Sequence, residues 1–170
     1  MPAEFDLARV YDDHAQALFG YLLNLTRNEA ETRDVLQEVF LKIARRTEIL
    51  SGTRDQRAFL LRLAHNTAID SMRRRDARER HHAQLGAEPI GLFAVSADPD
   101  EGEFRARLAA ALGDLPHEQR AVVLLKLWEE LTFEQIAATL NISANTAASR
   151  YRYALDKLRD RLRPLYEEIK

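Results

Sequence analysis

Apolar residues recur at helical intervals over most of the chain. Between residues 7 and 25 they are spaced by three, four or seven positions, which predicts one buried helical face. This stripe consists of Leu7, Tyr11, Leu18, Leu22 and Leu25. The polar run TRN ends it, and Asn28 with Glu31 three residues later predicts an N-cap and a second helix. The apolar stripe of that helix consists of Val35, Val39 and Ile43, beside Leu36 and Phe40.

The run LSGTRD breaks the pattern, and a third helix is predicted from about residue 56 to residue 80. The following segment, LGAEPIGLFAVSADPDEGE, contains two prolines and three glycines, so it is not expected to continue a helix. We therefore expect a linker over residues 84–100 between two units, residues 1–83 and 101–170. Four further helices are predicted over residues 101–113, 116–130, 132–140 and 143–163. The predicted fold is all-α, with two small helical domains.

The segment from residue 132 onward has the pattern of a helix-turn-helix. Thr132 and Gln135 form a capping-box pair, Asn141 suits a left-handed turn, and Ser143 can cap the next helix. The apolar side of that helix carries Ala147, Tyr151, Ala154, Leu155 and Leu158, and the opposite side carries Asn145, Ser149, Arg152 and Asp156. Polar and basic groups backed by an apolar face are typical of a helix that enters a DNA major groove. The alternative is an ordinary helical hairpin with a solvated face.

The third predicted helix is divided in a similar way. Its buried stripe consists of Leu61, Ala64, Ala68 and Met72, and its polar stripe of Arg62, Asn66, Asp70 and Arg73. Phe59 projects with the polar stripe. A ring among basic and amide groups suits single-stranded nucleic acid, because a base stacks on the ring while arginine neutralises phosphate. The alternative is that Phe59 packs at the mouth of the preceding loop.

Net charge conceals a segregation of charge along the chain. The 170 residues include 25 basic and 27 acidic residues. Residues 57–80 nevertheless contain seven arginines against three acids, and residues 143–163 contain six basic residues against two acids. Residues 98–118 contain six acids against two arginines. Two basic stripes are consistent with nucleic-acid contact that the whole-chain charge hides. The alternative is that these arginine-rich helices are solvated faces.

Several classes of protein are disfavoured by composition. The chain has no Cys, so we expect neither a disulfide framework nor a thiolate metal site. No apolar run is long enough to span a bilayer, and the acidic start does not resemble a signal peptide, so a cytoplasmic protein is expected. No cofactor fingerprint is present. His81 and His82 are interpreted as surface residues, not as a metal site.

Taken in order, these segments resemble the bacterial sigma-70 factors, in their compact two-domain extracytoplasmic-function (ECF) subgroup. DVLQEVFLKIARR is similar to the region that grips the clamp helices of RNA polymerase. RAFLLRLAHNTAIDSMRRR is similar to the region that melts and reads the minus-ten promoter element. Residues 112–162 are similar to the helix-turn-helix domain that binds the minus-thirty-five element and the polymerase flap.

The resemblance implies an initiation factor that binds core RNA polymerase and promoter DNA, catalyses nothing itself and uses no cofactor. The implied core-polymerase-binding set is Asp34, Gln37, Glu38 and Leu41. The implied minus-ten set is Phe59, Arg62, Asn66, Asp70, Arg73 and Arg74. The implied minus-thirty-five set is Asn145, Thr146, Ser149, Arg150, Arg152 and Tyr153. An inhibitory anti-sigma factor is a further partner that the family leads us to consider, and the sequence does not identify one.

Some positions depart from the family pattern. Ala147 stands where a bulky aliphatic residue is common, Ala148 where Lys or Arg is common, and Tyr153 at a frequently basic position. Base preference therefore cannot be carried over from the family. Trp is common where Phe59 stands, and an aromatic ring is retained.

Two functions from other classes remain as alternatives. A helix-turn-helix regulator that acts without joining polymerase would leave the polar face of residues 34–41 unexplained. A helical protein-interaction module or small enzyme is disfavoured, because no nucleophile, base or metal ligands converge in the sequence.

Overall fold

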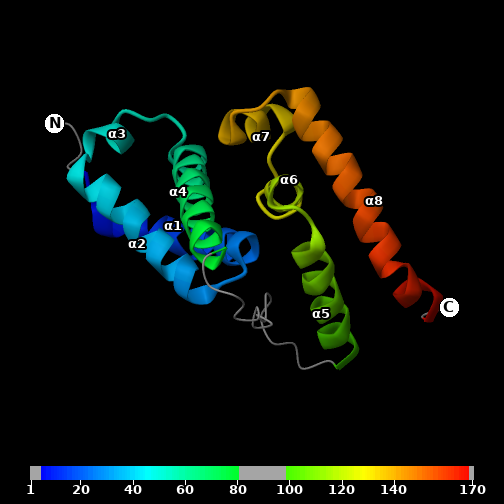
Figure 1. Cartoon of the computed structure of the whole chain (residues 1–170). Helices are drawn as coiled ribbons and strands as arrows, with labels where there is room; N and C mark the ends of the chain where they lie inside the picture. The colour runs from blue at the N-terminus through cyan, green and yellow to red at the C-terminus, as the bar shows by residue number, and fades with distance from the viewer. Residues whose placement is uncertain (1–4, 81–98, 169–170) are drawn as a thin grey trace. The chain divides into compact units, whose positions relative to one another are not determined.

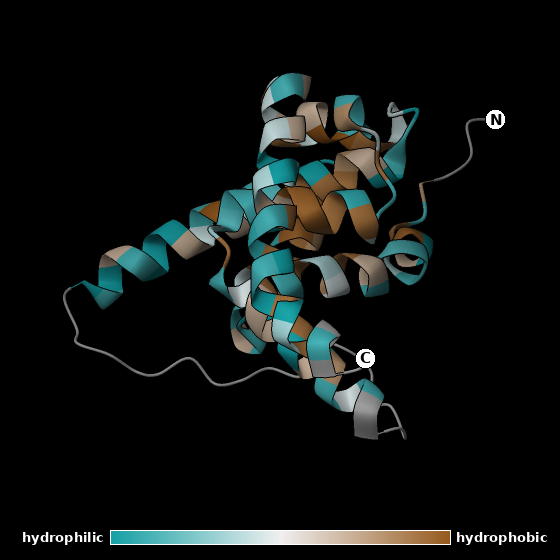
Figure 2. Ribbon diagram, turned by 90° about the vertical axis from the view of Figure 1, so that its right-hand side faces the viewer, coloured by the Kyte–Doolittle hydropathy of each residue, from teal (hydrophilic) through white to brown (hydrophobic). Residues whose placement is uncertain are grey.

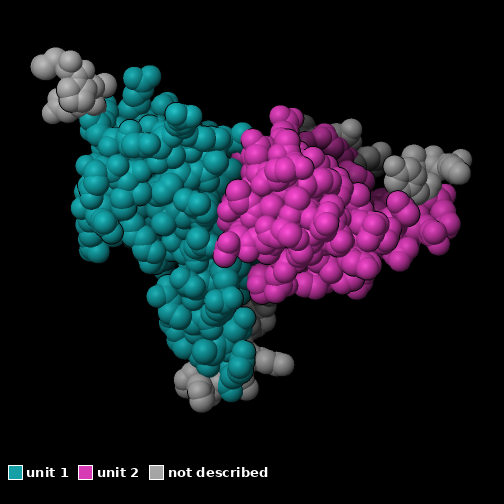
Figure 3. Space-filling view, turned by 90° about the horizontal axis from the view of Figure 1, so that it is seen from above, with its two compact units in different colours: residues 1–88 teal, residues 89–170 magenta. Residues whose placement is uncertain are grey.

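The computed structural model describes residues 5–80 and 99–168, and these residues form an all-α protein (Figure 1). Its helices are α1 (Leu7–Thr26), α2 (Glu29–Arg45), α3 (Glu48–Ser51), α4 (Gln56–Glu79), α5 (Pro99–Asp114), α6 (His117–Leu127), α7 (Phe133–Leu140) and α8 (Ala144–Glu168). The chain divides into two compact units, residues 1–88 and 89–170 (Figure 3). The predicted linker, apart from the two residues that begin α5, lies outside the described residues, as do His81 and His82.

Unit 1 is a bundle in which α1, α2 and α4 pack against one another. The stripes predicted from the sequence form its core, and the fully buried side chains include Leu22, Leu25, Val35, Val39 and Leu61. Burial of each such side chain contributes roughly 1.5–3 kcal/mol. In Figure 2 the hydrophobic stretches gather where helices face one another, and the outward turns are mostly hydrophilic.

Side-chain caps set where the helices of unit 1 begin. Asp6 accepts a hydrogen bond from the backbone N–H of Arg9 at 3.2 Å, and Asn28 accepts one from Glu31 at 2.9 Å. Asp55 accepts one from the N–H of Ala58 at 3.0 Å. These oxygens satisfy N–H groups that have no partner within the first turn of a helix. The predicted cap at Asn28 is confirmed.

Unit 2 is organised around α8, which packs against α5, α6 and α7. Its buried cluster contains Ala111, Leu112, Leu115, Val123, Ala154 and Leu158, with Leu108, Tyr151, Leu155 and Leu162 packed at its edge. The buried Arg120 donates from Nη1 to the carbonyl of Gly113 at 3.3 Å. This bond satisfies a carbonyl at the end of α5. The half-exposed Trp128 lies directly after α6, at its C-cap.

The helix-turn-helix has the predicted local chemistry. Thr132 and Gln135 form the reciprocal capping box at the start of α7. Asn141 ends that helix in the left-handed region, with φ 55° and ψ 49°. Ser143 Oγ accepts the N–H of Thr146 at 3.0 Å and so caps α8. These side chains fix the turn that orients α8.

The structure differs from the prediction in several details. α3 was not predicted, α6 ends at Leu127 and not at residue 130, and α8 continues through Pro164 to Glu168. Proline weakens a helix because it removes one hydrogen bond, but the buried Leu165 beyond it supports the last turns. Tyr11, predicted in a buried stripe, is 49% exposed.

Candidate protein and nucleic-acid interfaces

One exposed face of α2 carries the predicted polymerase-binding residues. Asp34 and Gln37 are exposed, and the apolar Leu41 is 48% exposed. Val35, Val39 and Ile43 are buried on the other side of the helix. An exposed Leu flanked by acidic and amide groups is available to a protein partner.

An open groove of about 570 Å³ extends this face towards α1. Its lining residues are Tyr11, Phe19, Arg33, Leu36, Gln37, Phe40 and Leu41. The Tyr11 and Phe40 rings meet edge to face with their centroids 4.8 Å apart. The groove was not predicted from the sequence, although Tyr11 and Phe19 are large aromatic residues on the same predicted helix.

Glu38 lies at the opposite edge of the α2 face, next to α4. Its carboxylate pairs with Lys42 Nζ at 3.0 Å and with the Arg74 guanidinium at 3.8 Å. Lys42 also donates to Thr67 Oγ1 at 3.3 Å. The predicted polymerase-binding and minus-ten sets therefore meet at one polar boundary between α2 and α4.

The outer face of α4 is polar and mostly basic. Arg62, Asn66, Asp70, Arg73 and Arg74 are exposed, as predicted. Phe59 is half-buried, and the Arg62 guanidinium carbon lies 5.8 Å from the centroid of its ring, within the range of a cation–π contact.

Phe59 also lines an open pocket of about 260 Å³. The other lining residues are Lys42, Ile43, Arg45, Arg46, Ile49 and Leu63. The pocket combines apolar side chains with three cations, of which Lys42 pairs with Glu38 at 3.0 Å and Arg46 pairs with Glu48 at 3.6 Å. The cations were not in the predicted minus-ten set; the basic run at the end of DVLQEVFLKIARR was the signal that could have found them.

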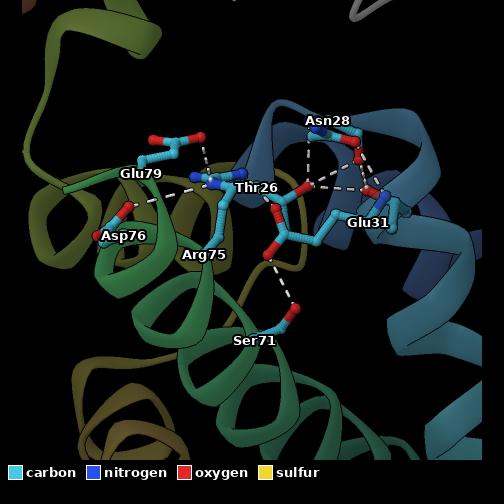
Figure 4. Close-up of polar contacts among 8 residues, drawn as sticks. Thr26, Asn28, Glu31, Ser71, Arg75, Asp76 and Glu79 are labelled. Atoms are coloured by element: carbon cyan, nitrogen blue, oxygen red, sulfur yellow. Dashed lines mark hydrogen bonds and ion pairs between the residues drawn. The ribbon is translucent and has the colours of Figure 1, made fainter. Parts of the chain in front are cut away.

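Arg75, next to the predicted pair Arg73 and Arg74, has a different environment. Its guanidinium pairs with Glu31 of α2 and approaches Asp76 at 4.0 Å and Glu79 at 3.8 Å (Figure 4). The Glu31 carboxylate also accepts the Ser71 hydroxyl at 2.8 Å. These contacts tie the C-terminal half of α4 to the first turn of α2.

The outward face of α8 carries the predicted minus-thirty-five residues. Asn145, Arg152 and Tyr153 are exposed, whereas Thr146, Ser149 and Arg150 are half-buried. The Arg152 guanidinium carbon lies 5.6 Å from the centroid of the Tyr153 ring. The predicted apolar side of this helix is confirmed: Ala147, Ala154 and Leu158 are buried.

Basic residues near the C-terminal end of α8 are partly neutralised by acids. Arg161 pairs with Asp114 of α5 at 3.3 Å, and Arg159 pairs with Asp156 at 3.6 Å. Arg163 is exposed and makes no ion pair within the described residues. Arg163 therefore has a charge that is available to a phosphate.

No helix among the described residues is both long and apolar enough to cross a membrane. No group of three or more His, Asp or Glu side chains in the same residues is arranged to hold a metal ion.

Family models match both units. The model of sigma-70 region 2 matches residues 10–78, and that of sigma-70 region 4 matches residues 111–160. Two solved structures share the fold: the sigma factor RpoE of Bartonella quintana with the anti-sigma factor NepR, and CnrH with the cytosolic domain of CnrY. Their TM-scores are 0.75 and 0.66, with 18% and 24% identity. The match to RpoE covers 94% of this chain and 98% of the RpoE chain, and the match to CnrH covers 93% of this chain and 88% of the CnrH chain.

Curated relatives align over almost the whole chain. The ECF RNA polymerase sigma factor SigL of Mycobacterium tuberculosis is 36% identical, over 96% of this chain and 93% of the relative. The RNA polymerase sigma factor CarQ of Myxococcus xanthus is 33% identical, over 92% of this chain and 88% of CarQ. The ECF RNA polymerase sigma factor SigX of Bacillus subtilis is 26% identical, over 94% of this chain and 85% of SigX. The chain therefore belongs to the ECF subgroup of the sigma-70 family of RNA polymerase sigma factors.

Proposed function

We propose that this chain binds core RNA polymerase in the cytoplasm and directs it to specific promoters, contributing recognition and no catalysis. Two exposed faces of unit 1 support this proposal. One exposed face, on α2, combines Leu41 with acidic and amide groups, and a separate face, on α4, is basic and includes an aromatic ring. The first face has the chemistry of a protein interface and the second that of a nucleic-acid interface.

The residue assignments follow from these faces. Asp34, Gln37, Glu38 and Leu41 would contact polymerase, and the groove beside Leu41 would receive an apolar side chain of the partner. The outer face of α4, with Phe59 and the pocket beside it, would hold the minus-ten strand. The exposed face of α8 would enter the major groove of the minus-thirty-five element.

An anti-sigma factor is proposed as a second protein partner. In one structure that shares this fold the anti-sigma factor NepR is bound to the sigma factor RpoE, and in the other the cytosolic domain of CnrY is bound to CnrH. An inhibitor that occupies the α2 face would exclude polymerase from the same residues.

The direct test is transcription by purified core polymerase on a library of promoter fragments, with and without the chain. Defined transcripts that appear only with the chain would support the proposal. DNA binding without polymerase-dependent transcripts would instead favour the helix-turn-helix regulator.

A triple variant, Gln37→Ala, Glu38→Ala and Leu41→Ala, tests the polymerase interface. None of the three residues belongs to the buried stripe, and the Glu38 ion pairs are partly solvated, so we expect unfolding to shift by less than about 1 kcal/mol. Core-polymerase affinity should fall at least about tenfold, which corresponds to ~1.4 kcal/mol. Affinity is measured with labelled chain and core enzyme. Unaltered affinity in the folded triple variant would exclude this interface, and Val39→Ala provides the contrasting variant, because it should lose stability.

A further inference from the structure

The three consecutive arginines of α4 are not equivalent. Arg73 is exposed and makes no ion pair among the residues that the structure describes. Arg74 is exposed and lies 3.8 Å from one half-exposed carboxylate. The Arg75 side chain is only 31% exposed and faces the carboxylates of Glu31, Asp76 and Glu79. A guanidinium among three acids has little charge left to offer a phosphate.

Glu31 is the most enclosed of these three acids, with a side chain only 9% exposed. One carboxylate oxygen accepts the Ser71 hydroxyl at 2.8 Å, and the other accepts Arg75 Nη1. Ser71 and Arg75 are four residues apart, so they lie on one side of α4, about one turn apart. The single carboxylate therefore holds one full turn of α4 against α2.

The backbone that carries Glu31 is itself fixed. Its N–H donates to the Asn28 side chain at 2.9 Å. The Thr26 and Thr32 hydroxyls lie 2.8 Å apart, and Thr32 Oγ1 donates to the Asn28 carbonyl at 2.8 Å (Figure 4). The carboxylate thus projects from a helix start with several internal hydrogen bonds. It is a rigid support for the turn that it binds.

We propose that Glu31 is a positioning residue for promoter recognition. In this proposal Arg75 pairs with Glu31 to hold α4 against α2, and it does not contact nucleic acid. The inference rests on the proposed function, in which α4 holds the minus-ten strand. Consecutive helical residues point about 100° apart, so holding positions 71 and 75 against α2 sets where Asp70, Arg73 and Arg74 project. Loss of the support would leave these side chains present but less precisely placed.

The test uses the full chain in complex with core polymerase. The probes are a single-stranded oligonucleotide with the minus-ten sequence preferred in the promoter library, and a scrambled oligonucleotide of the same composition. Affinity is measured for both at several salt concentrations. The ratio of affinities reports discrimination, and the salt slope reports phosphate contacts. The variants are Glu31→Gln, Arg75→Met, their combination, and Arg73→Met as the matched control.

Arg73→Met should weaken both oligonucleotides alike and reduce the salt slope by about 0.7, the value for one phosphate contact on a single strand. Arg75→Met should leave the slope unchanged and lower discrimination about tenfold, because a partly buried ion pair is broken. Glu31→Gln should lower discrimination similarly without reducing the slope. The double variant should lose little more than either single variant, as expected of residues that act as one pair.

A slope reduced by Arg75→Met as much as by Arg73→Met would make Arg75 a phosphate contact and overturn the inference. The positioning inference would also be overturned if Glu31→Gln and Arg75→Met both kept full discrimination. Weakened binding in Arg73→Met would then still support the α4 interface. Unchanged binding in all variants would instead reject the α4 interface of the proposed function. Helicity is measured for each variant. If Glu31→Gln fails to fold, Ser71→Ala, which removes one hydrogen bond, replaces it, with an expected two- to threefold loss of discrimination, about 0.4–0.7 kcal/mol.

Discussion

Phe59 shows how one side chain can serve both packing and recognition. Its ring lies beside Ile49 and Leu63 in an open pocket, yet it is only half-buried and lies near the Arg62 guanidinium. The two interpretations of Phe59 from the sequence, a ring packed at the loop and a ring available to a base, are therefore compatible. A substitution that preserves packing but removes the aromatic ring separates them.

We predict that Phe59→Ala and Phe59→Leu both weaken binding of the polymerase complex to a single-stranded minus-ten oligonucleotide. Loss of one stacked base should cost about 1 to 3 kcal/mol. Only Phe59→Ala should also lower the unfolding midpoint, because leucine still fills part of the space beside Ile49 and Leu63. Fluorescence anisotropy of a labelled oligonucleotide and thermal unfolding give the two readouts. Full affinity in the Phe59→Leu variant would show that the ring is structural.

At the residue scale the sequence predicted local chemistry better than tertiary contacts. The caps at Asn28, Thr132 and Ser143 depend on residues within one turn, and all three are confirmed. The edge-to-face contact of Tyr11 depends on Phe40 of another helix. The neutralisation of Arg75 depends on Glu31, which is 44 residues away in the chain. No local pattern contains such distant partners.

The helices show the same division between local and distant causes. The starts of α2, α7 and α8 were predicted within one residue from their capping side chains, and that of α4 from the break at LSGTRD. The extension of α8 beyond Pro164 was not predicted. A proline is a strong local signal for a helix end, whereas the support from Leu165 comes from tertiary packing. The candidate faces of α2, α4 and α8 were predictable because they are the complements of apolar stripes.

The position of an arginine on α8 predicts its effect on promoter binding. Arg152→Ala should cost roughly 1–3 kcal/mol on the preferred upstream element and reduce discrimination among element variants, if the guanidinium makes a bidentate base contact. Arg163→Ala should weaken all sequences alike and reduce the salt slope by about 0.9 on duplex DNA. Arg161→Ala should change binding less, because Asp114 already pairs with Arg161.

These affinities are measured for the polymerase complex on duplex promoters at several salt concentrations. A uniform loss of affinity in Arg152→Ala would make Arg152 a phosphate contact. No change in that variant would place α8 outside the groove.

At the scale of the whole molecule, opposite charges are sorted onto different surfaces. The net charge is only -2, yet the α4 and α8 segments are basic and the α5 segment is acidic. The free chain should therefore bind DNA weakly and non-specifically compared with its complex with polymerase, because long-range attraction follows the summed charge. The sequence revealed this segregation and the family. It did not reveal which cations are already neutralised, since that depends on folded neighbours such as Glu31 and Asp114.

The position of Trp128 provides a built-in optical probe for the two units. It is the one tryptophan of the chain, and it lies in unit 2 at the end of α6. Tryptophan fluorescence therefore reports the unfolding of unit 2, whereas far-ultraviolet circular dichroism reports the loss of helix in both units. With two separate cores, we predict that the two signals give different urea midpoints. Thr132→Ala, which removes the α7 cap at a cost of about 1 kcal/mol, should lower the emission midpoint and shift only the part of the circular-dichroism transition that unit 2 contributes. Coincident curves that shift together would mean that the two units unfold as one.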